Sequence, residues 1–122
     1  MSYYYSLRGW LEVSPEDFTK IVEKLKSLQV SYLEDQKLGL YMKGWCWYET
    51  PINWSGYLFY GAEVSIEGLD LLENVLKNIT SMNLQVSGYF HAQGEDGEKN
   101  FVYKVVDDGL TVEPSHILID VN

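Results

Sequence analysis

Apolar and polar residues alternate along the first segment of the chain. Between Tyr3 and Val13, every second position is occupied mainly by large apolar or aromatic residues, among them Leu7 and Leu11. Because successive side chains of a strand point to opposite faces, this pattern predicts a first strand over residues 3–13.

After Ser14 the spacing changes to that of a helix. Ser14 is a preferred N-cap residue, and Pro15 suits the first helical position. The apolar residues that follow recur at intervals of three and four, which is typical of a helix with one buried face. They are Phe18, Ile21, Val22, Leu25 and Leu28.

Similar patterns predict the remaining elements. A loop at residues 34–36 leads to a second strand over about residues 38–48, and a segment with Pro, Asn and Gly connects it to a third strand over 57–64. A second helix is expected to begin near Ser65 and to bury Leu69, Leu72, Val75, Leu76 and Ile79. Further strands are expected at 84–93, 100–106 and 110–113, with a short one over 116–121 after a bend at Pro114.

A short repeat supports this order of elements. Residues 12–16 (EVSPE) and 63–67 (EVSIE) lie 51 positions apart, share four of five identities, and each occupies a predicted strand-to-helix junction. Two strand-helix-strand copies predict an α+β protein, a ferredoxin-like βαββαβ sandwich with an added C-terminal β-hairpin. Its sheet is mainly antiparallel, with two helices on one face. If the two copies are instead independent N-cap sequences, the predicted fold is the same. The 122 residues fit a single domain over 1–122.

The alternation also assigns side chains to the two faces of the sheet. The face under the helices is expected to hold Leu40, Met42, Cys46, Leu58, Tyr60, Ala62, Val64, Val86 and Phe90. The opposite face is expected to hold Tyr4, Arg8, Trp10, Tyr41, Lys43, Trp45, Trp47, Tyr57, Phe59, Tyr89 and His91. So many aromatic side chains predict a partner-binding face or a homodimer interface. Two alternatives stay open: the C-terminal hairpin and tail fold across this face as a second small core, or the assignment is shifted by one residue, which exchanges the two sets.

The charge of the chain is acidic and unevenly distributed. The formal net charge is -9. Residues 1–61 carry six basic and seven acidic side chains, whereas residues 62–122 carry three basic and eleven acidic ones. This charge disfavours direct binding to nucleic acid or to a membrane and favours a basic protein partner. The alternative is a solvated acidic face that only keeps the protein soluble.

The acids that exceed the needs of local structure are Glu95, Asp96 and Glu98, which crowd one turn. Asp107 and Asp108 form another turn, expected at the opposite end of the same hairpin, where Asp and Gly serve the turn geometry. We therefore predict that the first group contacts the partner. Exposed loop charges contribute little to folding, so neutralising the three acids is expected to leave thermal stability nearly unchanged.

The sequence offers no catalytic or metal-binding motif. His91 and His116 lie on different predicted elements and form no ligand spacing, and no phosphate-binding loop is present. We therefore expect no cofactor, no metal and no enzymatic activity. The remaining enzyme or small-ligand hypothesis places His91 beside Tyr89 and Glu95 as a base.

Features that report the cellular compartment agree with one another. The first residues contain no basic region followed by an apolar one, and no run is long enough to span a bilayer. Cys46 is the only cysteine and has no partner for an internal disulfide. These observations predict a cytoplasmic protein.

The chain combines four features: small size, acidity, an aromatic face and the lack of catalytic motifs. It resembles the immunity proteins of bacterial contact-dependent and other polymorphic toxin systems, many of which neutralise basic nuclease toxins. The resemblance implies an inhibitory protein-binding module whose partner is a basic toxin domain. The alternative is a phage or mobile-element nucleic-acid mimic that inhibits a DNA-binding defence enzyme. The residues expected to bind the partner are Glu95, Asp96, Glu98, Trp10, Trp45, Trp47, Tyr57 and Tyr89.

Overall fold

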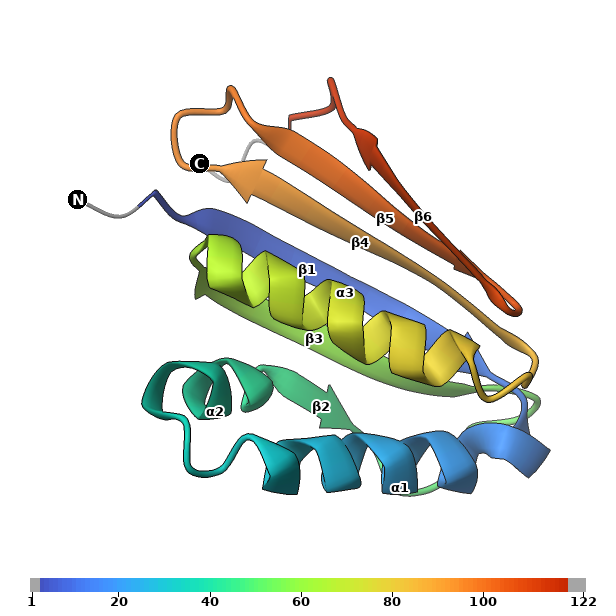
Figure 1. The fold of residues 1–122 in the computed structure, drawn as a ribbon. Coiled ribbons are helices and arrows are strands. Elements are labelled where there is room, and N and C mark those ends of the chain that lie inside the picture. Colours follow the sequence, from blue (N-terminus) through green and yellow to red (C-terminus); the bar gives the residue numbers. More distant parts are fainter. Residues whose placement is uncertain (1–2, 119–122) are drawn as a thin grey trace.

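The computed structural model describes residues 3–118 and contains six strands and three helices in that range. In chain order they are β1 (Tyr5–Val13), α1 (Pro15–Ser31), α2 (Gln36–Met42), β2 (Trp45–Trp47), β3 (Gly56–Val64), α3 (Ile66–Thr80), β4 (Val86–Gly94), β5 (Asn100–Val106) and β6 (Gly109–Pro114). The fold is of the mixed α+β type (Figure 1).

All six strands form one open antiparallel sheet in the order β2-β3-β1-β4-β5-β6. Strand β1 lies in the middle and pairs with β3 on one side and β4 on the other. The C-terminal hairpin β5–β6 continues the sheet beyond β4 and does not fold across its face (Figure 1). The alternative in which this hairpin covers the aromatic face is therefore wrong.

Both long helices begin where the sequence predicts. Ser14 and Ser65 occupy the N-cap positions of α1 and α3. Neither serine caps the backbone with its hydroxyl, however, since Ser14 Oγ donates to Asp17 and Ser65 Oγ donates to Glu67. The predicted apolar stripes are confirmed: all but Leu28, which is half-buried, are buried.

The segment between α1 and β3 differs from the prediction. The expected strand over 38–48 is a short helix, α2, followed by only three residues of strand, β2. Asp35 caps this helix, because its carboxylate accepts hydrogen bonds from the backbone N–H groups of Lys37 and Leu38 at 3.0 and 2.8 Å. The part of the chain that the structure describes therefore has three helices, where the sequence predicted two.

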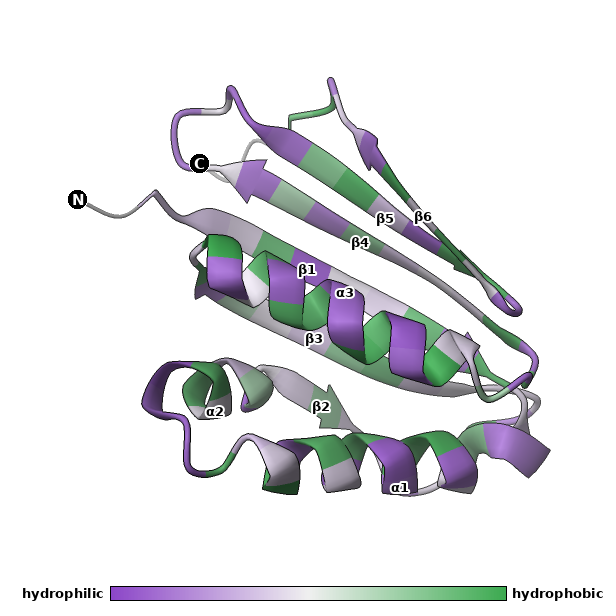
Figure 2. Cartoon of the chain, in the orientation of Figure 1, coloured by the Kyte–Doolittle hydropathy of each residue, from purple (hydrophilic) through white to green (hydrophobic). Residues whose placement is uncertain are grey.

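One face of the sheet packs into the core. In the paired register, Leu7, Leu11, Leu58 and Phe90 point to the same side, and at most 1% of each is exposed. Helix α3 runs across the sheet over β1 and β3 in Figure 1 and contributes buried leucines, valine and isoleucine to the same core. Figure 2 shows hydrophilic residues alternating with these at helical spacing along α3.

The chain leaves the sheet after Pro114. Residues 115–118 form no strand, so the predicted strand over 116–121 is absent from its described part. The rest of that prediction lies outside the described residues.

Candidate functional site

The face of the sheet that points away from the core carries a continuous row of side chains. We call this the open face. Across it, the strand register places Cys46 opposite Phe59, Phe59 opposite Trp10, Trp10 opposite Tyr89, and Tyr89 opposite Lys104. One register row thus crosses five strands and is aromatic at its centre.

Four aromatic side chains at the centre of this face form what we call the aromatic patch: Trp10, Tyr57, Phe59 and Tyr89. The rings of Trp10 and Tyr89 lie 5.6 Å apart, and those of Tyr57 and Phe59 are stacked at 5.9 Å. Trp10 is 42% exposed and Phe59 is 40% exposed, whereas Tyr57 and Tyr89 are half-buried. Exposed clusters of large apolar side chains mark interaction sites on soluble proteins.

Sequence reasoning placed Phe59 on this face but did not select it for the site. The alternation of Tyr57 and Phe59 along one strand was the signal that could have identified it. The structure stacks these two rings and sets Phe59 between Trp10 and Cys46. Cys46 was expected under the helices, and its exposed position on the open face corrects that expectation.

Trp45 and Trp47 were expected on the open face, and this placement is wrong. Trp45 pairs with Tyr60 and Trp47 pairs with Leu58, so both point toward the core. Trp45 is only 5% exposed and contacts the rings of Tyr60 and Phe90 at 5.3 and 5.7 Å. The cause is α2, which replaces the expected strand and shifts the alternation of β2 by one residue.

Helix α2 also changes which of residues 40–43 are buried and which are exposed. Tyr41 and Lys43 were expected on the open face and Leu40 beneath the helices. Tyr41 is instead buried in α2, Leu40 is 60% exposed, and Lys43 occupies the C-cap.

The C-terminal tail reaches one end of the open face. His91 is 2% exposed, and its Nε2 lies 3.0 Å from the carbonyl oxygen of Ile117. Ile117 and Leu118 themselves remain 61% and 57% exposed, so the described tail adds no second core. The aromatic patch stays exposed beside it.

Arg8 lies between the patch and this tail. It sits opposite Gly61 on β3 and His91 on β4, one register row from Trp10. The Nε atom of Arg8 and the Nδ1 atom of His91 are buried and have no hydrogen-bond partner. None of the three ion pairs within residues 3–118 involves Arg8.

The predicted acidic site is a loop that is attached to the N-terminal segment. Glu95 exchanges hydrogen bonds with the backbone of Tyr4, at 3.2 Å through its carboxylate and 2.9 Å through its N–H. Asp96 accepts hydrogen bonds from the Tyr3 hydroxyl and from the Glu98 N–H. These bonds, the Tyr3 bond first, hold the pKa of Asp96 below its usual value. Of the three predicted acids, Glu98 is the one whose carboxylate forms no hydrogen bond or ion pair inside residues 3–118.

The loop and the aromatic patch lie on the same sheet but not in contact. Tyr4, which holds the loop, is six residues from Trp10 along the chain, a separation of about 20 Å in a strand. Asp107 and Asp108 lie at the other end of β5, as predicted.

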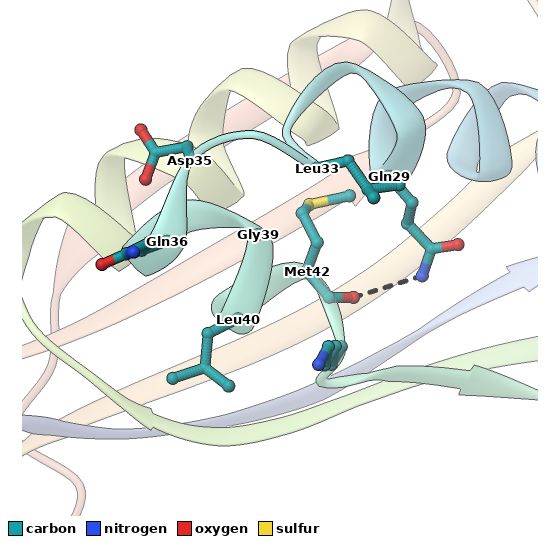
Figure 3. A pocket seen from close by; sticks show the side chains of 8 residues that line it. Gln29, Leu33, Asp35, Gln36, Gly39, Leu40 and Met42 are labelled. Atoms are coloured by element: carbon teal, nitrogen blue, oxygen red, sulfur yellow. Dashed lines mark hydrogen bonds between the residues drawn. The ribbon is translucent and has the colours of Figure 1, made fainter.

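A cavity of about 350 Å³ lies on the helical side, between the end of α1 and α2 (Figure 3). Leu33, Leu40 and Met42 supply its apolar wall. Two of its polar side chains are already engaged, since Gln29 Nε2 donates to the Met42 carbonyl at 3.2 Å and Asp35 caps α2. No histidine, cysteine or serine lines it.

The histidines are not brought together. His91 is buried beneath the tail, and His116 is exposed on the tail itself. Tyr89 shares the open face with His91, whereas Glu95 is bound to the Tyr4 backbone. Within residues 3–118 there is no group of three or more His, Cys, Asp or Glu side chains that could hold a metal ion.

Comparison with known proteins adds no family to these observations. No protein-family model, no curated protein and no solved structure matches the chain. None of the helices described in residues 3–118 has both the length and the apolar character needed to cross a membrane.

Proposed function

We propose that this protein is an inhibitory protein-binding module whose aromatic patch anchors a protein partner. The observation that carries the proposal is the exposure of Trp10 and Phe59 at the centre of a sheet face. Trp, Tyr and Arg are the residue types that contribute most to binding at protein interfaces, and this face combines Trp10, Tyr89 and Arg8.

The partner is a basic protein, as for an immunity protein that neutralises a nuclease-type toxin in the cytoplasm. The net charge of -9 supports this choice, because it accelerates encounter with a positively charged surface. A standard interface covers about 800 Å² on each partner, a disc about 30 Å across. One partner can therefore contact both the aromatic patch and Glu98 in the acidic loop.

The fold proposed for this module is a ferredoxin-like βαββαβ unit with both long helices on one face. The strand order β2-β3-β1-β4 supports it, as do the helices α1 and α3 that follow β1 and β3. Strands β5 and β6 then form the added hairpin, and α2 is an insertion before β2.

The test is capture of the partner by the tagged full-length chain in its native cells. We expect the wild-type chain to enrich a basic protein and to inhibit its toxic activity, so that cells expressing that protein survive. The matched variant with Trp10→Ala and Phe59→Ala should lose both effects, whereas Leu40→Ala, on the helical side, should retain them. Inhibition that persists unchanged in the folded double variant would overturn the proposal.

Two other outcomes would assign the patch differently. Inhibition of a DNA-binding defence enzyme without neutralisation of any toxin would identify a nucleic-acid mimic. Sedimentation of the purified wild-type chain as a dimer, with a monomeric double variant, would assign the patch to self-association.

A further inference from the structure

Arg8 is the only arginine in the chain and lies on the open face. It is half-buried, and its Nε atom is buried without a hydrogen-bond partner. On the same face, Glu63 lies one register row from Arg8 and Glu12 lies two rows away, yet neither forms an ion pair with Arg8 in the described residues. Glu12 instead accepts a hydrogen bond from Ser55 at 3.0 Å.

An arginine in this state is costly to the free protein. Burial of a charged or polar group without a partner lowers stability, and most buried polar groups of native structures are hydrogen-bonded to protein, water or an ion. His91, next to Arg8 on β4, adds a second buried nitrogen without a partner, Nδ1, and is 98% shielded from solvent. The unsatisfied Nε–H of Arg8 indicates a place where a ligand that accepts a hydrogen bond completes the bonding of this side chain.

The neighbouring strand leaves room for such a ligand. Gly61 lies opposite Arg8, and a Cβ atom built on it would meet no other atom within 4 Å. A group entering above Gly61 would lie beside Arg8 and one register row from Phe59 and Trp10. Aromatic neighbours of this kind exclude water and thereby strengthen a charged hydrogen bond.

On this geometry we propose that Arg8 binds a carboxylate of the partner protein, which enters over Gly61. The proposal rests on the proposed function and names the chemistry that the open face recognises. The planar guanidinium matches a carboxylate with two parallel hydrogen bonds, a geometry that lysine does not supply. A partner that is basic overall would thus insert one acidic group at the centre of the interface.

The first experiment needs no partner. Because the chain has one arginine, the ¹⁵N-labelled protein gives a single arginine Nε–Hε resonance, which belongs to Arg8. We expect sodium acetate to shift this resonance downfield in a saturable manner, and sodium chloride at the same ionic strength to leave it in place. An equal response to acetate, chloride and phosphate would indicate an adventitious ion only and would overturn the proposal.

A second arm tests whether the carboxylate belongs to the chain itself. Asp120 lies outside the described residues and is a carboxylate close in sequence to Ile117, which contacts His91. Asp120→Asn is expected to leave the Arg8 resonance and its response to acetate unchanged. A shift of the free-protein resonance in this variant would assign the ligand to the tail and would contradict the proposal.

The third arm measures affinity for the partner once it is known. Arg8→Gln is expected to weaken binding about 10- to 100-fold, and Arg8→Lys nearly as much, because the paired hydrogen bonds are lost. Lys104→Gln is the matched control, since Lys104 is another cation of the open face, and it should weaken binding less than about threefold. The melting temperature of Arg8→Gln should not fall, because the Arg8 Nε atom that the variant removes has no hydrogen-bond partner among residues 3–118.

The outcomes separate this inference from the proposed function. An unchanged affinity of Arg8→Gln, with a large loss for Trp10→Ala, would overturn the carboxylate site and leave the protein-binding module intact. No loss for either variant would contradict both.

Discussion

Asp96 illustrates how a single residue can serve the fold where the sequence suggested a binding role. Its carboxylate joins the β4–β5 loop to Tyr3 and also closes the loop through the Glu98 N–H. An acid in a Gly-Glu-Asp-Gly turn is visible in the sequence, but its partner 93 positions away is not. The sequence alone predicted that neutralising this loop leaves stability unchanged, whereas these contacts lead us to predict a loss of stability for Asp96.

The pH dependence of stability tests this assignment. Hydrogen bonds to the ionised carboxylate lower the pKa of Asp96 in the folded protein, so its stabilising effect is present at neutral pH and is lost as the pH falls through that pKa. Asp96→Asn should lower the melting temperature at pH 7, and the difference from wild type should shrink in acid. Asp108→Asn, in the opposite turn, serves as the control. Equal melting temperatures of Asp96→Asn and wild type at pH 7 would show that the loop bonds do not stabilise the fold.

At the scale of elements, prediction succeeded where the periodicity was long and failed where it was short. Helices α1 and α3 each repeat their apolar spacing over about three turns, which no strand can imitate. In α2, Leu38, Leu40 and Met42 alternate like a strand, while Leu38, Tyr41 and Met42 fit a helix. Seven residues do not distinguish the two periods, and the error then displaced Trp45 and Trp47 to the wrong face.

The side chain of Asp35 stabilises the helical alternative by capping the first turn of α2. Asp35→Ala removes the acceptor of two backbone N–H groups and should lower the free energy of unfolding by about 1 kcal/mol. Asp35→Asn keeps an N-cap acceptor, so the free energy of unfolding should fall by only about 0.3 kcal/mol. Urea unfolding of the two variants measures the difference. If Asp35→Ala unfolds at the same urea concentration as wild type, the cap does not stabilise α2.

At the scale of the whole molecule, the six-stranded sheet separates a packed face from an open one. The sequence predicted this division and most of the aromatic members of the open face. It could not show that Arg8 forms no ion pair with a carboxylate of residues 3–118 or that the tail reaches His91, because both depend on register and on contacts between distant segments. Charge is not confined to one face, since α3 carries exposed Glu67 and Asp70 on the helical side. The aromatic patch, more than the acidity, is therefore the feature on which our proposal of the open face as the binding surface rests.

The most direct test of this account is the dissociation constant of the complex with the captured partner. Trp10→Ala and Phe59→Ala are each expected to weaken binding at least about 30-fold, the effect of removing an interface hot spot, while their unfolding transitions remain cooperative. Leu40→Ala, an exposed apolar residue of α2, should change affinity less than about threefold. Wild-type affinity in the folded Trp10→Ala and Phe59→Ala variants would contradict the assignment of the open face as the binding surface.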